Sequence, residues 1–142
     1  STIEGYDFIL LDSPPSLGLL TLNALTAAQE IFIPLQTQFL ALQGISMLME
    51  TVQIVQTRLN PKLEVSGIIA TLFDGRKKLD REVIDYVQEL FGDKLFKTFI
   101  RENIALAEAP SFGKTIFEYR ANSHGAEDYL ALAHEIMKMG ER

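Results

Sequence analysis

The sequence predicts an α/β protein with a layered, mainly parallel sheet and flanking helices. Short apolar runs rich in β-branched and aromatic residues recur along the chain, as is typical of strands buried on both faces. Between them lie stretches with apolar residues at three- and four-residue steps, which predict amphipathic helices. Strand and helix therefore alternate, and this order indicates parallel strands joined by right-handed helical crossovers.

Four apolar runs are the predicted strands. Three of them are nearly continuous in apolar residues, and the last is weaker. In chain order they are DFILL at residues 7–11, IFIPL at 31–35, VSGIIATL at 65–72 and LFKTF at 95–99. Because ligands bind beyond the carboxyl ends of parallel strands, functional residues are expected in the segments that follow these runs.

The predicted helices lie between and after the strands. Residues 17–28 are apolar almost all round, so a well-covered helix is expected there. Asn60-Pro61 and Gly92 are stop signals for two of the remaining helices. These remaining helices each carry one apolar stripe, over residues 42–59, 79–91 and 126–137.

The composition limits the class of protein. With 142 residues the chain is expected to form one domain or part of one. It contains no cysteine, which excludes a disulfide scaffold, thiolate zinc sites and cysteine nucleophiles. The net charge of −6 means that nucleic acid would be bound only through a local basic patch. No apolar run reaches the ~20 residues of a membrane span.

An acidic residue ends the first predicted strand. Asp12 follows four apolar residues, a pattern typical of a Walker B strand. In that arrangement the carboxylate holds Mg²⁺ through water beside the phosphates of a nucleotide. The pattern is short, and a strand-end aspartate that caps the next helix is the alternative interpretation.

The residues around Asp12 form a more specific motif. The string LLDSPPSLGLLTLNAL resembles the ParA-type partition ATPases, a deviant Walker group that includes MinD. The resemblance continues through IFIPLQTQFLALQGISMLMETVQIVQ, ATLFDGRKKLDREVIDYV and ALAEAPSFGKTIFEYRANSHGAEDYLALAHEI. It covers essentially all 142 residues in order and implies part of a P-loop NTPase fold.

The resemblance implies ATP and Mg²⁺ as ligands of the complete ATPase. Asp12 matches the aspartate that holds Mg²⁺ through water. The turn that matches the γ-phosphate switch contains Ser13, Pro14, Pro15 and Gly18. Two loops match the adenine side of the nucleotide site, with Thr71, Leu72 and Phe73 in one and Arg101, Glu102 and Asn103 in the other. Arg101 stands where relatives have proline, and a purely capping role for Asn103 and Glu108 is the alternative.

A second cluster is basic. Arg76, Lys77, Lys78 and Arg81 place four cations within six residues, after an Asp-Gly turn. Such a loop can contact DNA phosphates without reading bases, and a solvated turn is the alternative. The resemblance favours DNA, because Arg76 matches an arginine that many relatives use for non-specific binding. Two further basic positions of the family are Ala105 and His124 here.

No glycine-rich phosphate loop of the form GxxxxGK[ST] or KGGxGKT occurs among the 142 residues. The resemblance therefore implies that residues 1–142 are a single domain fragment, the C-terminal portion of a ParA-type ATPase domain. No catalytic residue is assigned within it, and the chain alone is expected not to hydrolyse ATP. Relatives hold the phosphate-loop strand between those matching residues 7–11 and 31–35. Direct pairing of these two runs, or self-association, is expected instead.

The function implied by the resemblance is DNA partitioning, of a chromosome or a plasmid. ATP would drive formation of a homodimer that binds DNA non-specifically, and a ParB-type partner would stimulate hydrolysis. The expected location is the cytoplasm, at the nucleoid, without membrane binding. The alternatives are a MinD-like membrane-cycling ATPase and a non-catalytic half-domain that only binds a partner. The C-terminal residues 134–142 are too short and too mixed in charge for a MinD-like lipid-binding helix.

Overall fold

The computed structural model describes residues 4–14, 16 and 18–140. The chain forms two compact units, each built from separate stretches of sequence. The first unit comprises Ser1–Ile31 and Ser46–Glu64. The second unit comprises Phe32–Ile45 and Val65–Arg142 and contains most of the sheet.

The first unit is built around two helices. It contains α1, Leu19–Ala27, and most of α2, Phe39–Arg58. Asn60 ends α2 and links the two helices, because its side-chain amide donates to the carbonyl oxygens of Leu25 at 3.1 Å and Ala28 at 2.6 Å. The amide of Gln56 also donates to the Leu63 carbonyl at 2.8 Å. The turn at Asn60-Pro61 predicted from the sequence is thus held by side-chain hydrogen bonds.

The second unit contains a three-stranded sheet, confirming the predicted α/β class. Its strands are β1, Glu30–Gln36, β2, Glu64–Phe73, and β3, Ile100–Arg101, in the order β1-β2-β3. The strands are parallel, and Thr71 of β2 pairs with Ile100 of β3. The middle of β2 is buried on both faces, which explains its continuous apolar sequence.

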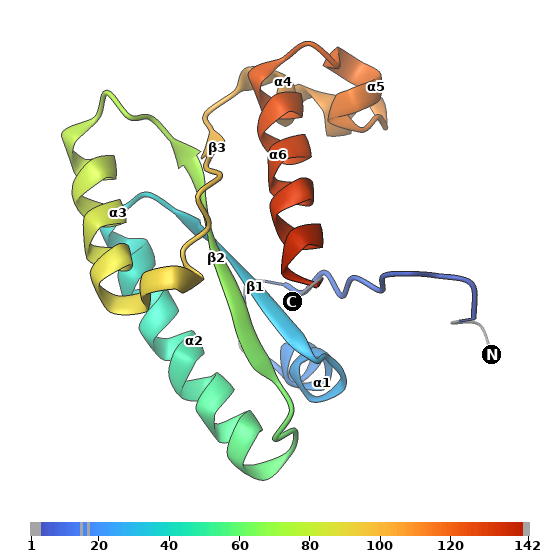
Figure 1. Cartoon of the computed structure of the whole chain (residues 1–142), viewed down its shortest axis with the longest axis vertical. Helices are drawn as coiled ribbons and strands as arrows, with labels where there is room; N and C mark the ends of the chain where they lie inside the picture. The colour runs from blue at the N-terminus through green and yellow to red at the C-terminus, as the bar shows by residue number, and fades with distance from the viewer. Residues whose placement is uncertain (1–3, 15, 17, 141–142) are drawn as a thin grey trace. The chain divides into compact units, whose positions relative to one another are not determined.

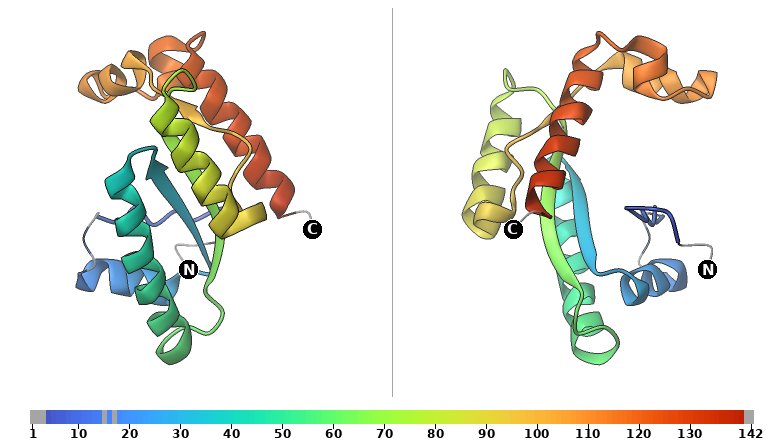
Figure 2. Two further views of the ribbon diagram at one scale, coloured as in Figure 1. Left: turned by 90° about the vertical axis from the view of Figure 1, so that its left-hand side faces the viewer. Right: turned by 45° about the vertical axis from the view of Figure 1, so that its right-hand side comes forward.

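Helices cover both faces of this sheet. Figures 1 and 2 show α3, Lys78–Phe91, and α6, His124–Met139, on opposite sides of β2. On the α6 side, the core contains Ile69, Phe96, Ile100 and Leu132. Gly67 is required on this face, because a Cβ there would collide with the ring of Phe96.

Short helices lie between α3 and α6. They are η1, Gly92–Lys94, α4, Ile104–Glu108, η2, Ala109–Phe112, and α5, Ile116–Arg120. Ala105, Ile116 and Ala126 form a small core between α4, α5 and α6. Thr115 and Glu118 form a capping box that starts α5.

All four predicted helices are confirmed, as α1, α2, α3 and α6, but α1 is not the well-covered helix expected, since Leu19 and Leu20 are exposed. Two strand predictions are wrong. Residues 7–11 form no strand, and Phe8, Ile9, Leu10 and Leu11 are exposed. An isolated extended segment leaves its N–H and C=O groups unpaired, so apolar sequence alone does not make a strand. Direct pairing of residues 7–11 with 31–35 is therefore not observed.

The strand predicted at residues 95–99 is displaced. Leu95 forms only an isolated bridge with Ile68, and β3 begins at Ile100. The cause is a competing acceptor, since the amides of Lys97 and Thr98 donate to the Glu135 carboxylate of α6 at 2.8 and 2.9 Å. These two amides are not available to a strand ladder.

Candidate functional site

One buried carboxylate connects the C-terminal ends of β1 and β2 in the second unit. Asp80 lies in the first turn of α3 and is only 5% exposed. Its Oδ2 accepts a hydrogen bond from the hydroxyl of Thr37, just after β1, and another from the amide of Asp74, just after β2, both at 2.8 Å. Glu102, after β3, donates its amide to the Phe73 carbonyl at 3.3 Å.

The predicted DNA-binding residues lie on the loop that starts at Asp74. The carboxylate of Asp74 accepts three hydrogen bonds from Arg76, from the backbone amide at 3.0 Å, from Nε at 2.9 Å and from Nη2 at 2.8 Å. These bonds lower the pKa of Asp74 to about 2. The pair is therefore fully charged at neutral pH.

The other cations of this loop also contact carboxylates. Lys77 Nζ lies 3.1 Å from Glu102, and Lys78 Nζ lies 3.2 Å from Glu82. Exposed ion pairs contribute only about 0–1 kcal/mol, and all four of these side chains are more than half exposed. A phosphate group can therefore compete with these carboxylates for the cations.

The two predicted adenine-side loops lie together in the second unit. Thr71 and Phe73 pair with β3 at Ile100 and Arg101, so the loops leave adjacent strands. Leu72, between them, has a left-handed φ of 54°, which is rare outside glycine. The Phe73 ring packs edge-on against Phe99 with 4.9 Å between centroids.

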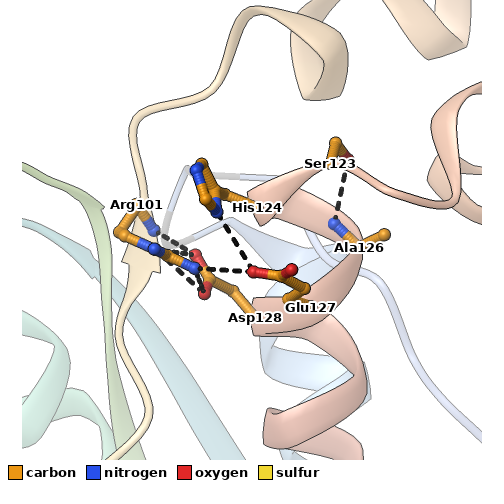
Figure 3. A network of polar contacts seen from close by, with 6 residues as sticks. All are labelled: Arg101, Ser123, His124, Ala126, Glu127 and Asp128. Atoms are coloured by element: carbon orange, nitrogen blue, oxygen red, sulfur yellow. Dashed lines mark hydrogen bonds and ion pairs between the residues drawn. The ribbon is translucent and has the colours of Figure 1, made fainter.

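Arg101 is tied to the start of α6, as Figure 3 shows. Its Nη2 donates to Asp128 Oδ1 at 2.6 Å, and its Nε donates to both oxygens of the same carboxylate. The Arg101 backbone amide adds a further bond to Asp128 Oδ2 at 2.9 Å. This pairing raises the pKa of Arg101 above its ordinary value. The guanidinium thus joins β3 to α6.

The same network includes two exposed residues. Glu127 Oε2 lies 3.1 Å from His124 Nδ1 and 3.4 Å from Arg101 Nη2. The hydrogen bond with His124, aided by Arg101, lowers the pKa of Glu127. His124 is the first residue of α6, and its side chain is exposed.

Asn103 caps α4, as one of the two sequence interpretations proposed. Its Oδ1 accepts from the Ala105 amide at 2.9 Å. Glu108 does not cap a helix but accepts a hydrogen bond from the Tyr119 hydroxyl at 3.0 Å, which raises the pKa of that tyrosine. The side-chain nitrogen of Asn103 takes no part in this cap.

Asp12 and the predicted switch belong to the first unit. Asp12, Ser13 and Pro14 are exposed and lie outside any helix or strand, and Pro15 lies outside the described residues. Gly18 precedes α1 as its N-cap residue, with extended backbone, and the Thr21 hydroxyl donates to the Ser16 carbonyl at 2.6 Å.

Asp12 presents one exposed carboxylate. Among the residues that the structure describes, no three His, Cys, Asp or Glu side chains gather where they could hold a metal ion. Magnesium commonly keeps several waters and binds one or two carboxylates together with substrate phosphates. A single exposed carboxylate such as Asp12 meets that requirement when a nucleotide supplies the phosphates.

Sequence reasoning missed the residues that hold this site together. Asp80, Thr37 and Asp128 were not predicted to have a role. An aspartate in the first turn of a helix is common for electrostatic reasons, so Asp80 gives no distinctive signal. Polar residues commonly follow strands, so Thr37 gives no distinctive signal either. Only the fold brings Thr37 next to Asp80.

The chain is similar to proteins of chromosome partitioning. It is 52% identical over 134 residues to the chromosome-partitioning ATPase Soj of Treponema pallidum. This match covers 94% of this chain and 53% of that protein. It is 48% identical over 137 residues to the sporulation initiation inhibitor protein Soj of Bacillus subtilis, covering 96% of this chain and 54% of the relative. This chain is a homologue of the Soj and ParA partitioning ATPases.

The homology extends over part of each relative. The chain spans about half the length of the curated relatives it matches, including 47% of the chromosome partitioning protein ParA of Myxococcus xanthus. A family model described as an AAA domain matches residues 2–65. The resemblance to ParA-type ATPases noted in the sequence is thereby confirmed.

Solved structures agree with this relationship. The chain matches a Mycobacterium smegmatis protein described as cobyrinic acid a,c-diamide synthase, crystallised with ADP and magnesium, with a TM-score of 0.77 and 30% identity. The match covers 99% of this chain and 50% of that one. A second structure of that protein contains an ATP analogue and magnesium. No described helix of the present chain is long and apolar enough to cross a bilayer.

Proposed function

We propose that this Soj/ParA homologue forms the C-terminal portion of an ATPase that partitions DNA. The observation that carries the proposal is the cationic loop Asp74–Lys78, found at a strand end in a homologue of chromosome-partitioning ATPases. A loop whose cations reach solvent can bind the phosphates of DNA of any sequence. In this proposal the protein forms an ATP-dependent homodimer at the nucleoid in the cytoplasm, and a ParB-type partner stimulates hydrolysis.

The nucleotide side of the proposal assigns the following roles. Asp12 holds Mg²⁺ through water, and residues 13–18 respond to the γ-phosphate. When bound, Mg²⁺ supplies charge stabilisation at the phosphates. Thr71, Leu72 and Phe73 contact the adenine side together with Glu102 and Asn103. Arg101 contributes its backbone there, because its guanidinium already contacts Asp128 and Glu127.

The DNA side assigns phosphate contacts to Arg76, Lys77 and Lys78. Lys77 and Lys78 exchange exposed carboxylate partners for phosphate oxygens, which adds little cost because exposed pairs are weak. Arg76 keeps its bonds to Asp74 and offers its remaining N–H groups to phosphate. The N-terminus of α3 has no side-chain cap, so its partial positive charge favours the same anion. No base contact is required.

Hydrolysis tests the nucleotide side. In the complete natural protein, Asp12→Ala should abolish Mg²⁺-dependent ATP hydrolysis while the fold is retained, because the metal loses its protein ligand. Asp7→Ala, which removes an exposed aspartate from the same segment before α1, is the control for general effects of substitution there. Wild-type hydrolysis by the Asp12→Ala variant would contradict the role of Asp12 in holding Mg²⁺.

The 142-residue chain alone should show no ATP turnover above background. Phosphoryl transfer needs positioned donors around the γ-phosphate, and no phosphate-loop motif occurs in this sequence. The alternative of a half-domain that only binds a partner also predicts this result for the chain alone. The complete protein separates the two, because a half-domain role predicts no Mg²⁺-dependent turnover there either.

A further inference from the structure

Asp80 contacts the cationic loop, Asp74–Lys78, through a hydrogen bond with Asp74. Its Oδ2 receives the Asp74 amide, and the Asp74 carboxylate in turn receives the amide and guanidinium of Arg76. The Asp74 carbonyl also accepts the Lys77 amide at 2.9 Å. The position of Asp74 thus determines where Arg76 and Lys77 lie.

The other end of this chain of contacts is fixed in the core. Thr37, which donates to the same Oδ2, is only 3% exposed and directly follows β1. Asp80 is itself buried, in the first turn of α3. One carboxylate oxygen therefore anchors the start of the loop to β1 and α3.

The geometry points to Asp80 as a positioning residue for the contact between Arg76 and DNA phosphate. This inference rests on the proposed DNA contact and adds a residue that touches no DNA itself. Asp80 holds Asp74 in place. Asp74 in turn holds the Arg76 guanidinium in solvent, just before the N-terminus of α3. Without Asp80 the loop samples other conformations and Arg76 binds phosphate at a larger entropic cost.

Charge makes the inference sharply testable. Removal of a carboxylate near a phosphate-binding loop makes the local potential more positive, which by itself strengthens DNA binding. A positioning role predicts the opposite sign for Asp80. Asp85 is the matched control, because it is an exposed aspartate of the same helix and contacts none of the loop residues discussed above.

The experiment measures affinity for duplexes of unrelated sequence, using the complete natural protein with ATP and Mg²⁺. Asp80→Ala should weaken binding about five- to tenfold, the effect of losing one well-placed charged hydrogen bond. Asp80→Asn keeps an acceptor oxygen and should retain most of the affinity. Asp85→Ala should bind as well as wild type or up to about twofold more tightly.

A double-mutant cycle separates positioning from a general loss of stability. In an Arg76→Ala background, Asp80→Ala should cause no further weakening, because both changes remove the same phosphate contact. Hydrogen exchange gives a readout without DNA. In Asp80→Ala the amides of Asp74, Arg76 and Lys77 should exchange faster, while amides in the middle of β2 keep their rates.

Each outcome decides the matter. If Arg76→Ala weakens DNA binding and Asp80→Ala does not, the inference is overturned and the proposed function stands. If Arg76→Ala has no effect, the DNA contact proposed for this loop is wrong, and hydrogen exchange still reports whether Asp80 holds the loop.

If Asp80→Ala does not fold, Thr37→Val removes one donor to the same oxygen. It should weaken binding about threefold, and unchanged affinity with unchanged exchange would overturn the inference.

Discussion

The Arg101 guanidinium joins β3 to α6. Asp128 is buried, so removing the arginine side chain leaves a carboxylate with only the Arg101 amide as partner. Arg101→Ala should therefore lower the free energy of unfolding by about 1–3 kcal/mol. Urea denaturation measures this, with Arg58→Ala, an exposed arginine at the end of α2, as control. Equal stability of the two variants would mean that the pair contributes nothing.

Glu135 predicts a pH dependence of stability. Burial raises its pKa, but the amides of Lys97 and Thr98 outweigh burial and bring the pKa below the ordinary 4.5. A lowered folded-state pKa gives a contribution that is full above 4.5 and lost as pH falls through the folded value. Glu135→Gln should thus be less stable than wild type near neutral pH, and the difference should shrink below 4.5.

Urea unfolding of both proteins between about pH 3 and pH 7 measures this difference. Glu89→Gln, on the outer part of α3, should show no such convergence with wild type. A constant gap between wild type and Glu135→Gln across the range would contradict the assigned role of the carboxylate.

Some residues of the candidate site could be predicted from the sequence and others could not. The cations at residues 76–78 were predicted from local sequence, since charge density on a turn needs no knowledge of the fold. The pairing of Lys77 with Glu102 was not predicted, because the two residues lie 25 positions apart in sequence. Contacts of that separation depend on which strands pair, and short motifs do not report this.

At the level of elements, Gly67 marks the closest packing between β2 and its neighbours. A side chain there would overlap the Phe96 ring, so Gly67→Ala should cost about 1–3 kcal/mol through overpacking. Gly44, exposed within α2, has open space around the position of a Cβ. Gly44→Ala should stabilise the protein by about 0.5–1 kcal/mol, since glycine disfavours helix interiors. Thermal unfolding of the two variants should shift in opposite directions, and equal shifts would contradict the packing.

Helices were predicted more reliably than strands for a physical reason. A helix satisfies its backbone within one segment, so the apolar stripes of α2, α3 and α6 were sufficient. A strand needs a neighbour, and residues 7–11 have none within the described chain. The 95–99 prediction failed because Glu135, distant in sequence, takes the amides that a ladder would use.

At the scale of the whole molecule, the exposed apolar segment at residues 6–11 predicts self-association. Leu10 is 88% exposed and Phe8 65%, and contiguous exposed apolar surface of this kind promotes association. The 142-residue chain should gain average mass across about 1–100 µM in sedimentation equilibrium. Phe8→Ser with Leu10→Ser should reduce the association, whereas Ile104→Ser, exposed elsewhere, should not. A monomer throughout would show that this surface does not drive contact between copies.

The central claim is that the loop Asp74–Lys78 binds DNA through phosphates alone. The most direct measurement is the affinity of the complete natural protein, with ATP and Mg²⁺, for several unrelated duplexes over a range of salt concentrations. Arg76→Ala should weaken binding equally for all duplexes and reduce the slope of log affinity against log salt by about one. An unchanged slope, or a loss confined to particular sequences, would contradict a phosphate-only contact at Arg76.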